Sequence, residues 1–166
     1  DRDEIIFTSG ATESNNLAIK SIPQVTTHRY VITQSTEHKC ILQSCVSLLR
    51  DKKINLQKLR PKKNGIIDLN ELEECFKKID KGTQTSMYRS FVSIMAANNE
   101  IGVIQPIREI AELCKKYNAI FHTDAVQAVG TTKIDVKEMD IDSLSLSSHK
   151  IYGPKGIGVI YLNKKF

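Results

Sequence analysis

Short apolar runs alternate along the chain with longer stretches in which apolar residues recur every three or four positions. The short runs predict strands over residues 4–8, 30–33, 54–59, 90–96, 119–123, 142–146 and 157–162. The longer stretches predict amphipathic helices over residues 12–22, 39–52, 69–79 and 107–117. Strands that alternate with helices of this length are typical of a parallel sheet with crossover helices.

Several residues mark where these elements begin and end. Pro23 is expected to end the first helix, because proline interrupts helical hydrogen bonding. Asp68 is expected to cap the third helix, and Pro106 to open the fourth. The polar stretch 80–89 predicts a loop.

The predicted fold class is α/β, with a mainly parallel mixed sheet. A glycine-rich connection without a helical pattern separates the last two strands, so residues 157–162 are expected to run antiparallel to residues 142–146. A chain of 166 residues with 40% apolar composition is long enough for one well-packed domain.

Composition narrows the function classes. The net charge of +5 comes from 24 basic and 19 acidic residues that are scattered along the chain, and tryptophan is absent. A nucleic-acid-binding surface would need a coherent basic stripe, so we expect no nucleic-acid partner. No apolar run approaches the roughly 18 residues that a membrane span needs, so we expect no membrane partner.

The cysteines and the chain ends add two further expectations. The four cysteines form no Cys-x-x-Cys pair, which favours reduced thiols; they are Cys40, Cys45, Cys75 and Cys114. No signal or transit segment is visible. The chain starts at Asp1 without a methionine and ends four residues after a predicted strand, so we expect a piece of a larger protein.

Clusters of polar residues lie directly after five of the predicted strands. They cover residues 9–13, 36–38, 98–100, 124–127 and 147–150. Open α/β sheets bind ligands outside the carboxyl ends of their strands. We therefore expect the five clusters to form one site at one rim of the sheet.

Lys150 and Asp124 carry the most distinctive chemistry. A lysine at the end of a buried strand can lose solvation, which favours its neutral amine. A neutral amine forms a Schiff base with an aldehyde such as that of pyridoxal 5′-phosphate (PLP), and Asp124 could keep a pyridine nitrogen protonated. Taken singly, Lys150 fits an ordinary surface lysine better, whereas Asp124 could equally be a helix cap.

The remaining clusters supply groups that suit the same cofactor. The turn at residues 9–12 opens a helix, where backbone N–H groups favour a phosphate, although a plain helix cap is the alternative. His38 could stack on a planar ring and move protons. Neutral hydrogen-bonding groups and further phosphate ligands would come from Asn99, Gln127, Ser147 and His149. His122 alternates inward on its strand and is interpreted as structural.

Five motifs of the chain resemble those of one known family. They are Ser9-Gly-Ala-Thr-Glu-Ser-Asn-Asn-Leu-Ala-Ile-Lys20, Thr36-Glu-His-Lys39, Asn98-Asn-Glu-Ile-Gly102, Asp124-Ala-Val-Gln127 and Ser147-Ser-His-Lys-Ile-Tyr-Gly-Pro-Lys-Gly-Ile-Gly158. Together they resemble cysteine desulfurases of the iron–sulfur-cluster-assembly type, in the class-V aminotransferase group of PLP enzymes. The resemblance runs over nearly the whole chain, and residues 81–89 look like an insertion.

The resemblance implies a role for each candidate site residue. Lys150 would carry PLP, Asp124 would pair with the pyridinium, and His38 would stack on the ring and shuttle protons. The phosphate would be held by Ala11, Thr12, Ser147 and His149. The ring oxygen and the substrate side would be contacted by Gln127 and Asn99.

The resemblance also implies a fold and an activity for the parent protein. Residues 1–166 would be the large domain of a fold-type-I PLP transferase, truncated at both ends and lacking the C-terminal small domain. The parent would be a homodimer that converts L-cysteine to L-alanine and passes sulfur, through an enzyme persulfide, to an iron–sulfur scaffold protein. The persulfide cysteine would lie outside this chain, so the piece alone should be inactive. The location would be mitochondrial or a related organelle in a eukaryote, and cytoplasmic in a bacterium.

Three alternatives stay open. A selenocysteine lyase or another class-V enzyme would use the same chemistry. A metal site could be built from His38, His122, Asp124 and His149, although their spacing matches no known ligand pattern. A basic, non-catalytic partner-binding domain is the third alternative.

Overall fold

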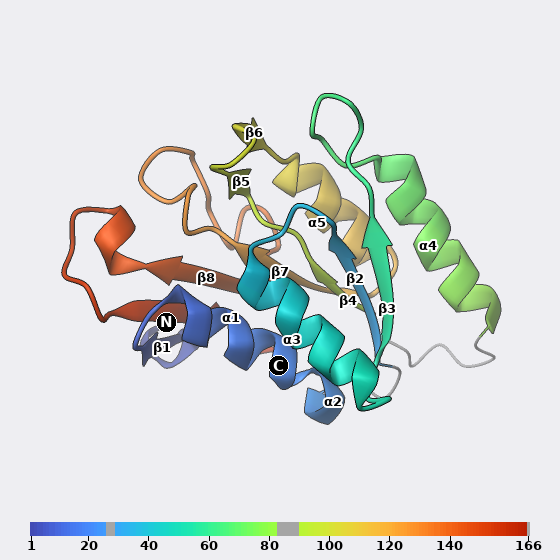
Figure 1. Cartoon of the computed structure of the whole chain (residues 1–166), viewed down its shortest axis with the longest axis horizontal. Helices are drawn as coiled ribbons and strands as arrows, with labels where there is room; N and C mark the ends of the chain where they lie inside the picture. The colour runs from blue at the N-terminus through green and yellow to red at the C-terminus, as the bar shows by residue number, and fades with distance from the viewer. Residues whose placement is uncertain (26–28, 83–89, 166) are drawn as a thin grey trace.

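A seven-stranded sheet organises the described residues of the computed structural model, which are residues 1–25, 29–82 and 90–165. The strand order is β1-β9-β8-β7-β4-β2-β3 (Figure 1). The strands are β1 (Ile5–Thr8), β2 (Tyr30–Gln34), β3 (Asn55–Leu59), β4 (Phe91–Ser93), β7 (Ile120–Asp124), β8 (Ser143–Ser147) and β9 (Gly158–Leu162). Neighbouring strands from β8 to β3 pair in parallel, whereas β9 is antiparallel to both β8 and β1.

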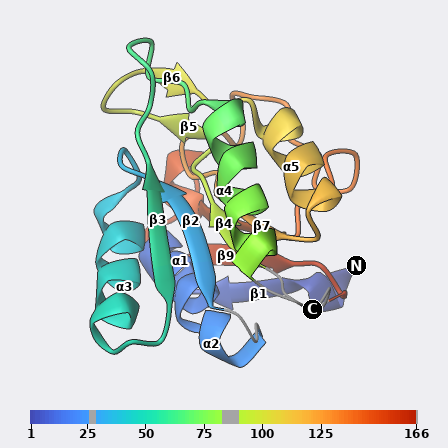
Figure 2. The same ribbon diagram turned by 90° about the vertical axis from the view of Figure 1, so that its right-hand side faces the viewer.

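Helices cover both faces of this sheet. They are α1 (Ala11–Lys20), α2 (Ile22–Val25), α3 (Lys39–Arg50), α4 (Leu69–Gly82) and α5 (Ile107–Lys116), with 3-10 turns η1 (Arg2–Glu4) and η2 (Ser148–Lys150). Figure 2 shows α1 and α3 on one side of the sheet and α4 and α5 on the other. The fold is therefore a three-layer α/β sandwich.

Two apolar clusters fill the spaces between the three layers. Successive residues of β2 point into different clusters, with Val31 on the α1–α3 side and Ile32 on the α4–α5 side. Ile120 and Phe121 divide in the same way on β7. The central strands are buried on both faces for this reason, and they carry buried polar residues beside the apolar ones.

The predicted class and the antiparallel last strand are confirmed, and three details are corrected. Pro23 lies inside the short helix α2 instead of ending α1, because the first turn of a helix needs no N–H at that position. Helix α1 ends earlier, with Ser21 as its C-cap. Helix α4 continues to Gly82, into the predicted 80–89 loop, and residues 83–89 lie outside the described residues.

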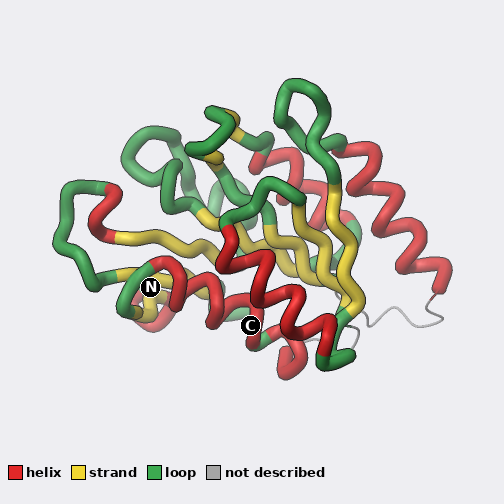
Figure 3. Tube along the Cα trace, in the orientation of Figure 1, coloured by secondary structure: helices red, strands yellow, loops and turns green. Residues whose placement is uncertain are grey.

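The predicted strand at residues 90–96 is also shorter than expected. Strand β4 covers Phe91–Ser93, and the N–H groups of Ile94 and Ala96 still donate to β7 carbonyl groups. The segment β5 (Ala97–Asn98) then forms a small antiparallel hairpin with β6 (Val103–Ile104). The hairpin places the polar residues 98–100 beyond the sheet. In Figure 3 the green loops, this hairpin region included, gather along the upper and left sides of the sheet.

His122 is buried in the middle of β7 and joins three strands. Its Nδ1 lies 2.9 Å from Ser93 Oγ on β4, and its Nε2 lies 3.0 Å from Ser145 Oγ on β8. Burial lowers the pKa of His122 to about 3, so the ring is neutral at physiological pH. These contacts match the structural role expected from the sequence.

None of the helices in the described part of the chain has both the length and the apolar character that crossing a bilayer requires.

Candidate active site

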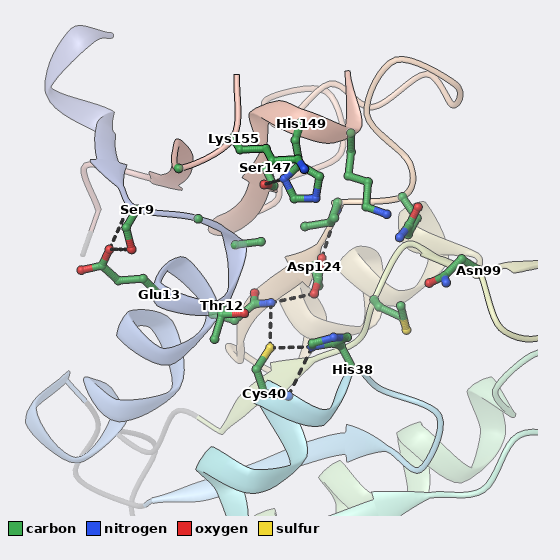
Figure 4. A pocket seen from close by; sticks show the side chains of 18 of the residues that line it. Ser9, Thr12, Glu13, His38, Cys40, Asn99, Asp124, Ser147, His149 and Lys155 are labelled. Carbon is green, nitrogen blue, oxygen red and sulfur yellow. Dashed lines mark hydrogen bonds between the residues drawn. The ribbon is translucent and has the colours of Figure 1, made fainter. Parts of the chain in front are cut away.

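A cavity of about 580 Å³ opens at the carboxyl ends of the parallel strands (Figure 4). All nine residues predicted for the site line it: Ala11, Thr12, His38, Asn99, Asp124, Gln127, Ser147, His149 and Lys150. They come from five separate strand-end segments. The structure thus brings together every residue of the predicted site, while their individual roles stay predictions.

The start of α1 forms one wall of the cavity. Ser9 directs both its N–H and its hydroxyl to Glu13 Oε2, at 2.6 and 2.7 Å, which fixes the turn before the helix. Ala11 and Thr12 form the first turn, where backbone N–H groups have no partner within the helix. Such a helix start favours an anion.

Gly158 permits this turn to lie directly on β9. A Cβ atom at Gly158 would come within 2.4 Å of the Gly10 carbonyl carbon and 2.5 Å of Thr8 Oγ1. Any larger residue would push the turn away from the strand. The glycine is therefore required by the close approach of two backbone segments rather than by its own φ angle.

Ser147 and Lys150 frame the opposite wall. Ser147 ends β8, and its Oγ lies 2.8 Å from His149 Nδ1. Lys150 ends the 3-10 turn that follows, and its side chain is exposed. The expected loss of solvation is wrong for this structure, since the buried strand stops at Ser147, three residues before the lysine.

Asp124 lies at the floor of the cavity, where it is only 4% exposed. Its Oδ1 accepts from the Val126 N–H at 3.0 Å, and its Oδ2 accepts from Asn15 Nδ2 at 2.6 Å. Burial raises the pKa of Asp124, against the hydrogen bonds from Val126 and Asn15 and the nearby His38, which lower it. A cationic N–H from a ligand would favour the ionised carboxylate.

His38 is both the N-cap of α3 and part of the cavity lining. Its Nδ1 accepts from the Cys40 N–H at 3.3 Å and lies 2.9 Å from Cys40 Sγ. Because a backbone N–H can only donate, Nδ1 is the acceptor, and the neutral ring carries its proton on Nε2. His38 therefore caps a helix and lines the cavity at the same time.

Asn99 and Gln127 reach the cavity from two turns. Asn99 lies in the turn of the β5–β6 hairpin, and Gln127 lies in the turn after β7. Neither belongs to the sheet itself, so each is positioned by the loop that follows a buried strand.

Asn15 and Cys40 line the cavity but were not among the predicted site residues. Asn15 is 1% exposed and lies one helical turn after Ala11, on the same side of α1. That spacing could have revealed it. Cys40 was grouped with the other thiols, although it lies only two positions after His38.

Glu37 supports the cavity from behind. Its Oε1 accepts from the Met95 N–H and, at 2.9 Å, from Gln34 Nε2. Burial raises the pKa of Glu37 to about 8, against these two hydrogen bonds, which lower it. The side chain ties the loop that carries Met95, a lining residue, to the end of β2.

The metal-site alternative gains no support from the geometry. Both ring nitrogens of His122 are occupied by Ser93 and Ser145 inside the sheet. Across residues 1–25, 29–82 and 90–165, no three His, Cys, Asp or Glu side chains form a group that could hold a metal ion.

Comparison with known proteins decides the family. The family model described as aminotransferase class-V matches residues 1–166. The chain belongs to this family. Cysteine desulfurases are among the relatives of this class-V chain: the mitochondrial enzyme of Saccharomyces cerevisiae is 50% identical over 99% of the chain and 32% of its own length. The cysteine desulfurase IscS of Buchnera aphidicola is 49% identical over 99% of the chain and 39% of its own length.

Solved structures show the same fold. A structure described as SspA in complex with cysteine superposes with a TM-score of 0.84 at 40% identity, covering 99% of this class-V chain and 45% of that protein. The chain spans about a third of the length of the curated relatives that it matches, from 32% to 39% for the two named above.

Proposed function

We propose that this chain is the PLP-binding large domain of a cysteine desulfurase, which converts L-cysteine to L-alanine. The observation that carries the proposal is the meeting of Lys150, Asp124 and His38, from three different elements, around one cavity. Relatives at 49–50% identity are named cysteine desulfurases, and a similar structure contains cysteine. Both findings favour cysteine as the substrate.

The residues around the cavity fit the cofactor. Asp124 is buried and has no lysine or arginine among the described groups that shift its pKa, so a protonated pyridine nitrogen would supply the missing positive charge. The N-terminus of α1 would hold the phosphate together with Ser147 and His149. Lys150 would hold the cofactor covalently. Bound PLP supplies an electrophilic carbon and a ring that accepts electrons from the substrate.

Proton movement would fall to His38 and Lys150. The Nε2 nitrogen of His38 carries the ring proton, since Nδ1 is held by the start of α3, so Nε2 is the atom able to exchange protons. Lys150 would react through its neutral amine, and its exposed side chain lies at the cavity within reach of an incoming ligand.

The wider activity follows from the relatives and is part of the proposal. The parent protein would act as a homodimer and transfer sulfur, through a persulfide on a cysteine outside this chain, to an iron–sulfur scaffold protein. It would work in mitochondria or a related organelle if eukaryotic, and in the cytoplasm if bacterial. The mitochondrial name of the yeast relative and the bacterial IscS relative support these two locations respectively.

Borohydride reduction in the presence of PLP tests the central assignment. Reduction should fix the cofactor on Lys150, and peptide mapping of the full-length protein should place the label there. Lys155 lines the same cavity and is the matched control. Lys150→Ala should abolish labelling, whereas Lys155→Ala should retain it. Label on Lys155 in the unmodified protein would refute the assignment.

A turnover assay tests the substrate. Full-length protein supplied with L-cysteine should release alanine, and Lys150→Ala should release none. A preference for selenocysteine over cysteine would instead indicate the selenocysteine lyase activity that shares this chemistry.

A further inference from the structure

A buried chain of hydrogen bonds joins Asp124 to His38 through two residues that the proposed function leaves unused. Asn15 Nδ2 donates to Asp124 Oδ2 at 2.6 Å and to Cys40 Sγ at 3.4 Å. Cys40 Sγ in turn lies 2.9 Å from His38 Nδ1. Figure 4 shows this path as a continuous row of dashed lines from Asp124 past Cys40 to His38.

The donors and acceptors along this path are mutually consistent. An amide NH₂ has two hydrogens, and the two acceptors of Asn15 are the carboxylate and the sulfur. The thiol accepts from Asn15 and donates to His38 Nδ1, which already accepts from the Cys40 N–H. Turning the Asn15 amide around would set its oxygen against the Asp124 carboxylate, so repulsion fixes its orientation.

The bridge is buried, although the two groups that it joins differ in exposure. Asn15 is 1% and Cys40 8% exposed, whereas the His38 side chain is exposed. Burial raises the pKa of the Cys40 thiol, which keeps it protonated and able to donate. Asn15 Oδ1 is buried and has no hydrogen-bond partner among the described residues, so the amide is held by its NH₂ group.

We propose that Asn15 and Cys40 are positioning residues that hold the Asp124 carboxylate and the His38 imidazole in a fixed relative position at the cavity where PLP would bind. Among the described residues, α1 and α3 are also joined by the hydrogen bond from Ser44 Oγ to Asn16 Oδ1, but that contact does not reach β7. This inference rests on the proposed function for its effect on PLP, but the hydrogen bonds exist without the cofactor.

The first test needs no cofactor. In ¹⁵N spectra of the histidine side chains, Cys40→Ala should move the His38 Nδ1 signal, and Cys40→Ser, which keeps a donor, should restore it. Asn15→Leu should also move that signal, although Asn15 does not touch His38. The matched controls are Cys45→Ala, on the same helix but away from the cavity, and Asn16→Leu, which removes an amide that pairs with Ser44. Both should leave the signal in place.

The second test measures PLP binding to the full-length protein by absorbance titration. Cys40→Ala and Asn15→Leu should each weaken binding about tenfold, as expected for loss of a hydrogen bond that supports a charged group. The double variant should bind PLP no more than about tenfold more weakly than the unmodified protein, because both changes break the same bridge. The two control variants should bind as the unmodified protein does.

The outcomes separate this inference from the proposed function. Two results would refute the proposed bridge: an additive loss of about 100-fold in PLP affinity in the double variant, or an unchanged His38 signal in Asn15→Leu. If Cys40→Ala fails to fold, Asn15→Leu decides alone, because Asn15 hydrogen-bonds Cys40 Sγ and makes no hydrogen bond to His38 among the described residues. If the unmodified protein takes up no PLP, the proposed function fails, and the ¹⁵N measurement still decides whether the bridge exists.

Discussion

His122 and Asp124 lie two positions apart on β7, but their surroundings differ. His122 lies in the interior of the sheet, whereas Asp124 lies at the rim of the cavity. In the interior, each nitrogen of His122 meets a serine hydroxyl on a neighbouring strand. At the rim, the Asp124 carboxylate is held by Val126 and Asn15, without a full positive charge beside it. The ring nitrogens of His122 are satisfied by the fold itself, while Asp124 at the rim keeps capacity for a ligand.

Asp124→Asn should produce the largest functional effect and the smallest loss of stability. The neutral amide can no longer balance a protonated ring, so turnover of the full-length protein should fall about 100-fold or more. Stability should change by less than about 1 kcal/mol, because the Asn15 amide can turn its unpartnered oxygen toward the new NH₂ group. Alanine release and urea unfolding measure the two effects.

The sign of the pH dependence at Asp124 sharpens this prediction. Its folded-state pKa is raised, so its contribution to stability is fully present at low pH and is lost as pH rises through the folded pKa. In Asp124→Asn, this decrease in stability with rising pH should be absent. A variant that retains full turnover, or that unfolds outright, would contradict the distinction between rim and interior.

His122→Leu should have the opposite profile, with a large loss of stability. The substitution leaves the Ser93 and Ser145 hydroxyls buried without their partner, at a cost of about 2 to 4 kcal/mol in the free energy of unfolding. Urea unfolding measures it. The matched control adds Ser93→Ala and Ser145→Ala to His122→Leu. Removing every partner together should recover part of the loss, and no recovery would show that packing, rather than hydrogen bonding, holds this site.

Glu37 shares features with both residues, and its effect should appear in the pH dependence of stability. One carboxyl oxygen is partnered by Met95 and Gln34, while the other is buried without a partner among the described residues. Because its folded-state pKa is about 8 against an ordinary value of 4.5, its contribution to stability should decline as pH rises between those values.

Glu37→Gln should flatten this pH dependence by on the order of 2 kcal/mol between pH 5 and pH 8. Glutamine keeps the oxygen that accepts from Met95, so the loop should stay in place. Urea unfolding at a series of pH values is the measurement. Equal slopes for the two proteins would mean that Glu37 is ionised in the folded state throughout this range.

The sequence placed the predicted residues at the cavity because each of them follows a predicted strand. The strand ends are marked by a change from apolar to polar residues, as at Thr123 and Asp124 or at Leu146 and Ser147. Parallel strands bring such ends to one rim, so local pattern was enough to place the five clusters together.

The sequence predicted less well which side chains are exposed and where short helices and strands begin and end. Lys150 was expected to be desolvated, but the 3-10 turn carries it out of the sheet into an exposed position. The β5–β6 hairpin was missed because each of its strands has two residues, too few to show a periodic pattern. Pro23 was expected to end a helix, yet it fits within the first turn of α2.

By itself the sequence determined the α/β class, the antiparallel last strand and the segments that surround the cavity, because apolar periodicity and strand-end polarity are local properties of the chain. Only the tertiary structure decided that Asn15 and Cys40 connect Asp124 to His38. Those contacts join residues 25 and 109 positions apart, and their distances depend on how α1 and α3 pack against β7. Packing of this kind is set by the shapes of many side chains together, and no short stretch of sequence records it.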